Sequence, residues 1–192
     1  MNPQDEASLI KIKCVIDMAI DFSAMTRVFE KRSKQKIAEK LEYYLGLLAD
    51  IDRKDNFEKI HSEFCEWLVK NVCSSKKDLE NKNSQAASYG QAAKLFNVAA
   101  KVYVYYCHLP DCESNAMLLP MLHAALDNLM MKKLKEKYPK ENIKAQTISD
   151  VDKFEYVALQ KLVTRHIEDD YKNMILPVQY DDIMWHRLNR PS

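Results

Sequence analysis

The sequence predicts an all-α protein, and three observations lead to that class. Of its 192 residues, 47% are apolar and 30% are charged, which is enough apolar material for one sizeable core. Only 2 glycines and 6 prolines occur, too few for the many tight turns of a β-sandwich, a barrel or a nucleotide-binding α/β fold. Apolar residues also recur at three- and four-residue steps along most of the chain. We expect about seven helices in one compact domain over residues 1–192.

Three amphipathic helices are predicted in the first part of the chain. Their apolar stripes fall within residues 9–20, 37–48 and 57–72. Asp55 followed by Glu58 predicts a capping pair for the third of these helices. The polar residues 73–85, rich in Ser, Lys and Asn, predict a loop, which could divide two helical lobes around a cleft.

The next two helical regions are more apolar. Residues 86–107 predict the central helix of the domain. Residues 102–106 are all β-branched or aromatic, which is typical of a strand, but no second strand-like run could pair with them, so we expect them to be helical. Residues 117–131 predict a further helix, or two short ones interrupted near Pro120 or Asp127.

Two more helices complete the chain. Ser149 and Asp152 predict the start of a long helix, and Pro177 is expected to separate it from a short terminal helix over residues 181–188. The sequence contains no internal repeat and no low-complexity tract that would mark a second domain.

The sequence also predicts a compartment. The first six residues are polar, unlike a signal peptide, and no run approaches the 18 or so apolar residues that a membrane span requires. The 5 cysteines are odd in number and widely spread, which favours reduced thiols over a disulfide framework. We therefore expect a cytoplasmic protein that makes no membrane contact.

Most familiar catalytic and metal-binding motifs are missing. Two glycines cannot form a G-x-G-x-x-G motif or a P-loop, and no G-x-S-x-G motif is present. Histidine and cysteine recur together at His61 and Cys65, and again at Cys107, His108, Cys112 and His123. A zinc site could be drawn from them, but no paired C-x-x-C occurs, and buried thiols beside ordinary histidines explain the pattern as well. We predict neither a metal nor a cofactor.

Two stretches carry a local excess of positive charge, although the net charge of the whole chain is only +1. Residues 131–144 hold six lysines and two glutamates, and residues 27–40 have the same excess. Such clusters can neutralise phosphates, but they are also common on solvated helix faces. The candidate nucleic-acid contacts are Lys132, Lys133, Lys135 and Lys137.

Three further stretches stand out: residues 89–106, which begin Tyr-Gly-Gln-Ala-Ala-Lys; residues 122–127, Leu-His-Ala-Ala-Leu-Asp; and residues 176–185, Leu-Pro-Val-Gln-Tyr-Asp-Asp-Ile-Met-Trp. Read together, they resemble the helix-hairpin-helix superfamily of base-excision DNA glycosylases, in particular its archaeal-type 8-oxoguanine glycosylase branch. In that family a lysine at the start of a helix is followed by an aspartate in a Pro-x-Asp context, and here Lys94 and Asp127 are 33 residues apart. Ala125 stands in place of the proline, and Gly90 is the single glycine where the family's hairpin usually has two.

The resemblance implies base excision on DNA through a lysine nucleophile. Lys94 would attack C1′ of the damaged nucleotide, while Asp127 would help to activate the amine and stabilise the oxocarbenium-like sugar. The damaged base would be flipped out of the stack and held against an aromatic wall. The candidates for that wall are Phe96, Tyr103 and Trp185.

Other interpretations stay open. Lys94 could be a solvated lysine on an amphipathic helix, and Asp127 could be a helix N-cap. With 10 tyrosines and 9 methionines, the chain could also be a non-enzymatic helical subunit that presents an adaptable surface to a protein partner. A glycosylase-like scaffold reused for binding alone is a third alternative.

Overall fold

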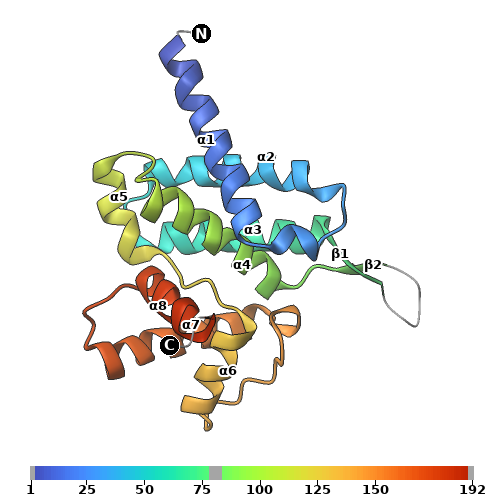
Figure 1. Cartoon of the computed structure of the whole chain (residues 1–192), viewed down its shortest axis with the longest axis vertical. Helices are drawn as coiled ribbons and strands as arrows, with labels where there is room; N and C mark the ends of the chain where they lie inside the picture. The colour runs from blue at the N-terminus through green and yellow to red at the C-terminus, as the bar shows by residue number, and fades with distance from the viewer. Residues whose placement is uncertain (1–2, 78–83, 190–192) are drawn as a thin grey trace.

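The computed structural model describes residues 3–77 and 84–189, and it confirms the all-α class (Figure 1). These residues hold eight α-helices, close to the predicted number, and one small antiparallel sheet. The helices are α1 (Pro3–Phe22), α2 (Ser33–Gly46), α3 (Lys54–Asn71), α4 (Tyr89–Ala100), α5 (Cys112–Leu118), α6 (Asn128–Lys137), α7 (Lys153–Tyr171) and α8 (Pro177–Asn189). The strands are β1 (Cys73–Lys77) and β2 (Ser84–Ala86). Shorter helical segments are η1 (Met25–Arg27), η2 (Leu47–Asp50), η3 (Lys101–Tyr106), η4 (Leu119–Met121) and η5 (Ile148–Asp150).

The helices form two groups that lie one above the other in Figure 1. Helices α1 to α5 make up the upper group and α6 to α8 the lower group, and α4 packs against members of both. The first half of α1 extends beyond the body of the protein, and its described side chains are exposed there (Figure 1). No helix in the described ranges is long and apolar enough to cross a membrane.

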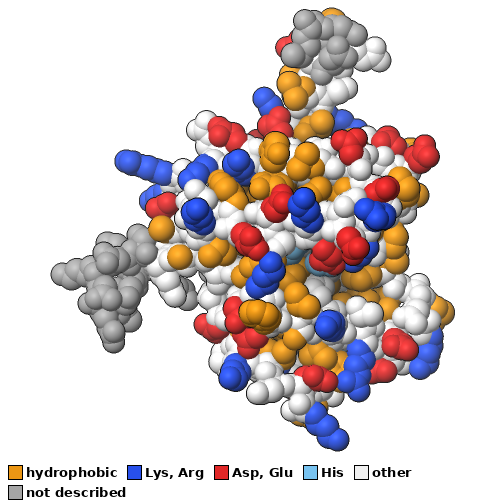
Figure 2. Space-filling view, turned by 180° about the vertical axis from the view of Figure 1, so that it is seen from behind, with side chains coloured by type: hydrophobic (Ala, Val, Ile, Leu, Met, Phe, Trp, Pro, Cys, Tyr) orange, Lys and Arg blue, Asp and Glu red, His pale blue; other side chains and the backbone are white. Residues whose placement is uncertain are grey.

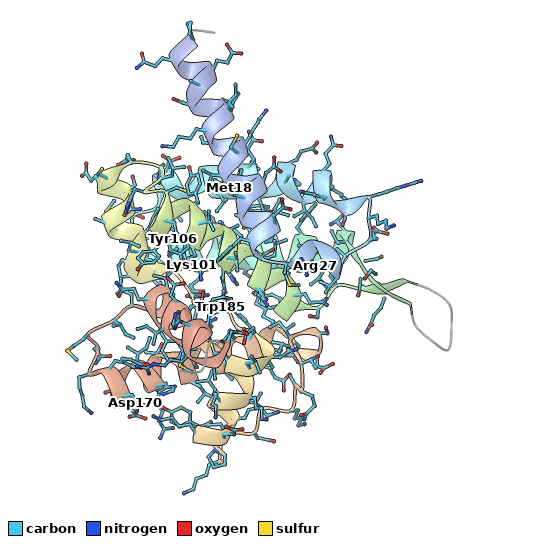
Figure 3. The ribbon with its side chains drawn as sticks, in the orientation of Figure 1. Met18, Arg27, Lys101, Tyr106, Asp170 and Trp185 are labelled. Atoms are coloured by element: carbon cyan, nitrogen blue, oxygen red, sulfur yellow. The ribbon has the colours of Figure 1, made fainter. Side chains whose placement is uncertain are left out.

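Helix α4 is the central helix, as the sequence predicted, and almost every residue in it is buried. Its start is fixed by a reciprocal capping box: the Gln91 backbone N–H donates to the Ser88 hydroxyl at 3.1 Å, and the Ser88 N–H donates to the Gln91 side chain at 2.9 Å. The helix continues as the π-helical segment η3, so residues 102–106 are helical as predicted. The two ends of this segment, Lys101 and Tyr106, contact α8 (Figure 3).

The segment between α3 and α4 differs from its prediction as a loop. Strands β1 and β2 pair there as an antiparallel hairpin, while residues 78–83 lie outside the described residues. The hairpin does not separate the two groups of helices, because α3 and α4 on either side of it pack against each other. The chain instead passes from the upper to the lower group at residues 122–127, which corrects the predicted division within residues 73–85.

Residues 122–127 form an extended stretch between η4 and α6, which we call the crossing segment. The predicted interruption of the helix over residues 117–131 therefore occurs near both Pro120 and Asp127. Extended backbone in a helical core has no neighbouring strand, so its polar groups need side-chain partners. The amide groups of Asn97 and Gln160 donate to the Ala124 carbonyl at 3.0 and 2.8 Å, and this contact holds the segment in the core.

The structure tests three predicted helix starts, those of α3, α7 and α8. Helix α3 begins at Lys54 without a side-chain cap, so the expected Asp55 and Glu58 pair does not form. Helix α7 begins after Asp152, whose carboxylate accepts the Glu155 N–H at 2.8 Å, close to the predicted start. Pro177 does not separate α7 from α8 but opens α8, since proline is well tolerated in the first helical turn.

The two glycines of the chain give a matched pair for testing the packing of α4. A Cβ on Gly90 would lie 2.5 Å from the Ile148 carbonyl oxygen and 2.7 Å from Cβ of Val151, whereas a Cβ on Gly46 would meet nothing within 4 Å. We expect Gly90→Ala to lower the free energy of unfolding by about 1–3 kcal/mol through overpacking. Gly46→Ala should raise it by up to about 1 kcal/mol. Urea denaturation would measure both, and equal stability of the two variants would contradict this packing.

Candidate functional site

A pocket of about 370 Å³ between α1, α4 and α8 brings together several residues that the resemblance selected. We call it the Lys94 pocket. Its chemically relevant lining residues are Phe22, Lys94, Lys101, Tyr106, Asp127, Asp181, Asp182 and Trp185. They come from the end of α1, from α4 and η3, from the crossing segment and from α8. Figure 3 shows Lys101, Tyr106 and Trp185 where η3 faces α8.

Lys94 and Asp127 both line this pocket, and both are half-buried. Within the described residues, the Lys94 ammonium makes no hydrogen bond or ion pair. Asp127 is the N-cap of α6, because its Oδ1 accepts the Met130 N–H at 2.8 Å. The N-cap interpretation is therefore confirmed, and Oδ2 of Asp127 has no hydrogen-bond partner among the described residues. An amine and a carboxylate oxygen thus remain available in one pocket.

The aromatic wall differs from the prediction. Trp185 lines the pocket with 48% of its surface exposed, and the sequence did not select Phe22 and Tyr106, which join it at 63% and 46% exposure. Phe96 is fully buried, with its ring centroid 5.1 Å from that of Phe64, so its assignment to base stacking is wrong. Phe96 comes two residues after Lys94, about 200° further around the helix, and therefore faces the core.

Tyr103 also fails as a stacking candidate because it is buried in the core. Gly90, the single hairpin glycine of the resemblance, is not free to bind a phosphate. Its backbone N–H donates to the Val151 carbonyl at 3.0 Å. The feature that would anchor DNA in the family therefore has another role in this chain.

The four lysines selected as nucleic-acid contacts lie on α6 and do not line the Lys94 pocket. Lys133 pairs with Glu136 at 3.0 Å, and Lys132 lies 4.0 Å from the same glutamate. Lys135 donates to the Ala145 carbonyl at 2.9 Å, and Lys137 pairs with Asp170. Such exposed pairs contribute little to stability and break readily, so phosphate contact by these lysines stays a prediction.

A buried ionic cluster forms one wall of the Lys94 pocket. The Lys101 ammonium contacts Asp181 at 2.5 Å and Asp182 at 3.0 Å, and the Tyr106 hydroxyl donates to Asp182 at 2.7 Å. Burial lowers the pKa of Lys101, but the two carboxylates outweigh it and raise that pKa overall. Burial also raises the pKa of Asp181, against the effect of Lys101. The cluster joins the upper and lower groups, and Lys94 is the amine of the pocket that has no partner among the described residues.

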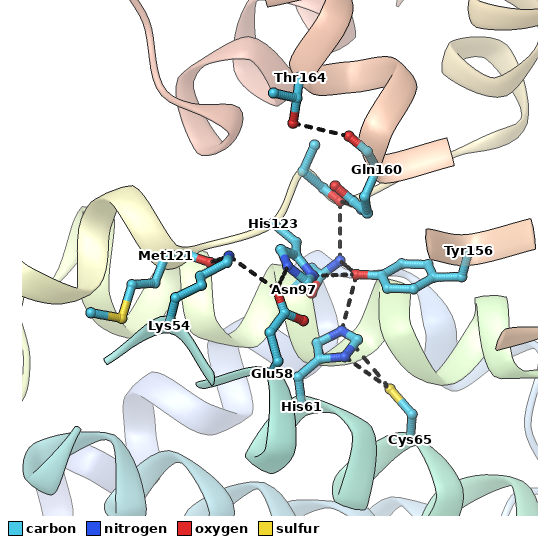
Figure 4. Close-up of polar contacts among 11 residues, drawn as sticks. Lys54, Glu58, His61, Cys65, Asn97, Met121, His123, Tyr156, Gln160 and Thr164 are labelled. Carbon is cyan, nitrogen blue, oxygen red and sulfur yellow. Dashed lines mark hydrogen bonds and ion pairs between the residues drawn. The ribbon is translucent and has the colours of Figure 1, made fainter. Parts of the chain in front are cut away.

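A second cluster, which sequence reasoning did not assemble, joins α3, α7 and the crossing segment and reaches α4 through Asn97 (Figure 4). The Tyr156 hydroxyl is 2.7 Å from Nδ1 of His123 and 3.1 Å from Nε2 of His61. Asn97 donates to the same hydroxyl at 2.9 Å, and Nε2 of His123 is 2.9 Å from Glu58. We call these five residues the Tyr156 network.

One arrangement of protons satisfies every contact at Tyr156. His123 donates through Nε2 to the Glu58 carboxylate, so its neutral ring accepts the Tyr156 hydroxyl proton at Nδ1. The Tyr156 oxygen then accepts from Asn97 and from Nε2–H of His61. Both histidines are neutral in this arrangement, and a proton added to His123 would force the tyrosine hydroxyl to turn towards His61.

The surroundings of the network favour those neutral histidines. Burial lowers the pKa of His61 well below its usual value and also lowers that of His123. Burial opposes ionisation of Glu58, but His123 and Lys54 together lower its pKa to about 2. No group of three His, Cys, Asp or Glu residues within the described part of the chain is arranged to hold a metal ion. Cys65 lies 3.9 Å from the His61 ring nitrogens without further ligands.

The individual residues of the network were visible, but their association was not. His61 and Cys65 stood out by their four-residue spacing, whereas Tyr156 follows His61 by 95 residues and His123 by 33. No local pattern links such distant positions. No protein-family model, curated protein or solved structure is significantly similar to this chain.

The ionic cluster predicts a pH-dependent effect of losing Lys101. Lys101→Met would leave the Asp181 carboxylate buried without its cation, and we expect the free energy of unfolding to fall by about 3–5 kcal/mol. The folded-state pKa of Asp181 is already raised by burial, and without Lys101 it would lie still further above its unfolded value. The loss of stability relative to wild type should therefore grow as the pH rises from about 4. Urea denaturation across this range would measure it. In the double variant Lys101→Met/Asp181→Asn, the loss of stability relative to wild type should not increase with pH. A loss that is independent of pH in both variants would contradict the buried ion pair.

The Tyr156 network predicts a loss of stability in mild acid. The folded-state pKa values of His61 and His123 are lowered, so below about pH 6.5 the unfolded chain binds protons that the folded protein does not. The free energy of unfolding should therefore decrease by about 1–3 kcal/mol for each unit that the pH falls below 6.5. His123→Gln should reduce this slope, whereas His186→Gln, at an exposed histidine, should not. An unchanged slope in His123→Gln would count against a neutral buried histidine.

Proposed function

We propose that the protein is a DNA glycosylase-like enzyme that excises a base through Lys94. One observation carries the proposal: Lys94 and Asp127, selected from the sequence as nucleophile and carboxylate, line the same pocket together with Trp185. The residues of the pocket have the chemistry that this reaction requires, since one amine is unpaired among the described residues and one carboxylate oxygen is unbonded among them.

In the proposed reaction, the neutral Lys94 amine attacks C1′ of the damaged nucleotide. The bond between C1′ and the base nitrogen breaks, and its electron pair leaves with the base, which takes up the proton that the amine loses. Opening of the sugar ring, with a proton taken up at O4′, then gives an iminium between Lys94 and C1′. Oδ2 of Asp127 would stabilise the positive charge that develops on the sugar.

The rim of the Lys94 pocket supports recognition of an unstacked base. Phe22, Tyr106 and Trp185 are large, exposed aromatic side chains around the opening, and aromatic faces bind flipped or single-stranded bases by stacking. The volume of about 370 Å³ lies in the range of small-molecule sites. We infer that one nucleobase, and not a longer stretch of DNA, would enter the pocket.

The exposed face of α1 favours a second candidate function, a non-enzymatic interaction subunit. Leu9, Ile10, Met18 and Phe22 are exposed along α1, whose first half extends beyond the body (Figures 1 and 3). Exposed apolar side chains of this kind often mark protein interfaces. This candidate predicts that Phe22→Asp removes partner binding and that Lys94→Gln leaves it intact.

Borohydride trapping on DNA would test the enzyme proposal. Oligonucleotides with one 8-oxoguanine, one uracil or one abasic site would be incubated with the protein and sodium borohydride, which reduces the iminium to a stable adduct. We expect an adduct with the wild type on at least one of these oligonucleotides and none with Lys94→Gln or Lys94→Arg. Asp127→Asn should lower the rate by about 100-fold, because asparagine can still cap α6 but carries no charge.

Lys140→Gln, at an exposed lysine outside the Lys94 pocket, is the matched control and should react like the wild type. Circular dichroism would verify that every variant folds. An adduct of equal yield in Lys94→Gln would reject Lys94 as the nucleophile. A folded wild type that gives no adduct on any of these oligonucleotides would reject lysine-based base excision on them.

A further inference from the structure

A second pocket, of about 800 Å³, lies apart from the Lys94 pocket, between α3 and α7. We call it the α3–α7 pocket. Positions 54, 58 and 62 share one face of α3 and positions 153, 157 and 161 share one face of α7, because each set repeats every four residues, and both sets line this pocket. The crossing segment and residues 173–177 close the remaining sides. Figure 2 shows a histidine recessed among charged side chains near the middle of the face turned away from Figure 1.

The charges around the α3–α7 pocket are mostly positive. Four lysines line it, Lys54 and Lys59 from α3 and Lys153 and Lys161 from α7, against the single carboxylate of Glu58. The His61 and His123 rings beside them add no charge in the arrangement described above. The lining therefore has an excess of three positive charges, which attracts an anion and repels a cation.

Carboxylates just outside the lining reduce that excess but do not remove it. Lys153 pairs with Glu66 at 2.7 Å and Lys59 lies 4.0 Å from Glu63, so an excess of one positive charge remains when these two glutamates are counted with the lining. Lys161 makes no ion pair with any described residue. Burial lowers the pKa of Lys54 in spite of the neighbouring Glu58, so a bound anion would stabilise its charged form.

Part of the wall of the α3–α7 pocket is apolar. Leu122, Val157, Ile175 and Leu176 line it, together with two prolines. Val157 is 44% exposed, so an apolar surface already faces the open space. A simple inorganic anion would leave this wall unused, whereas an anion attached to a ring or chain would contact both the lysines and the wall.

We propose that the α3–α7 pocket binds a small organic anion, a carboxylate or a phosphate joined to an apolar group. Its volume lies within the range of small-molecule sites and is larger than one nucleobase requires. The proposal is independent of base excision, because no residue of the Lys94 pocket takes part in it.

Isothermal titration calorimetry with four probes would test the proposed chemistry. Octanoate and octyl phosphate carry an anion on an apolar chain, octyltrimethylammonium carries a cation on the same chain, and inorganic phosphate has no chain. We expect saturable binding of one or both anionic probes, at least about tenfold tighter than binding of the other two. The tighter of the two anionic probes shows whether the pocket prefers a carboxylate or a phosphate. Equal binding of the cationic probe, or no saturable binding of either anionic probe, would overturn the proposal.

Two variants on α7 would place the ligand in the pocket. Val157→Asp puts a negative charge on the apolar wall and Lys161→Glu reverses a charge at the rim, so each should weaken binding at least about tenfold. Phe154→Asp, also on α7 but 84% exposed and outside the lining, and Lys140→Glu are the matched controls and should change affinity less than twofold.

Circular dichroism would verify that Val157→Asp and Phe154→Asp both fold. Equal affinity of the two folded variants for the anionic probes would show that the probes do not bind in the α3–α7 pocket. A further titration with duplex DNA tests whether the lysines of the α3–α7 pocket bind a polyanion instead of a small organic anion. If Lys161→Glu weakened DNA binding while octanoate and octyl phosphate failed to bind the wild type, the lysines would serve a polyanion and the proposed small-molecule site would be rejected.

Discussion

The hydrogen bonds from Asn97 and Gln160 to the Ala124 carbonyl are the contact on which the arrangement of both pockets depends. Ala124 lies in extended backbone inside a helical core, where an unpaired carbonyl would cost about 1–3 kcal/mol. Asn97 belongs to α4 and Gln160 to α7, so one carbonyl ties the central helix to the lower group. Because Asn97 also donates to Tyr156, the same side chain joins the crossing segment to the Tyr156 network.

The extended form of the crossing segment explains why two pockets exist. Leu122 and His123 line the α3–α7 pocket, whereas Ala125 and Asp127 line the Lys94 pocket. In an α-helix, residues four apart would lie on one face, so His123 and Asp127 would belong to one site. The segment is not helical, and His123 lines the α3–α7 pocket whereas Asp127 lines the Lys94 pocket. The crossing segment therefore separates the two pockets and contributes one titratable side chain to each of them.

Periodicity predicted most of the helices because burial of one face is a local property of the sequence. The stripe of Phe57, Phe64 and Leu68 on α3 is buried as its spacing indicated. Contacts between distant residues had no such signal: Lys101 and Asp181 are 80 residues apart, and Glu58 and His123 are 65 apart. Periodicity also placed apolar residues on α4 without deciding which of them would face a pocket. Lys94 and Asp127 were selected by resemblance, and burial of the Phe96 face turned Lys94 towards the opening.

Polar contacts, more than apolar ones, fix how the lower group sits on the upper group. Lys101 and Tyr106 bind α8 at the end of the central helix, and the Tyr156 network binds α7 to α4 through Asn97. Apolar surfaces can slide with little change in energy, but a buried ion pair or hydrogen bond requires a defined distance and direction. A shift of α7 and α8 relative to α4 would separate at least one of these pairs in a buried environment, where an unpaired group is costly. The two polar clusters therefore set the width of the pockets beside them, which makes the shape of each pocket a consequence of residues that its ligand need not touch.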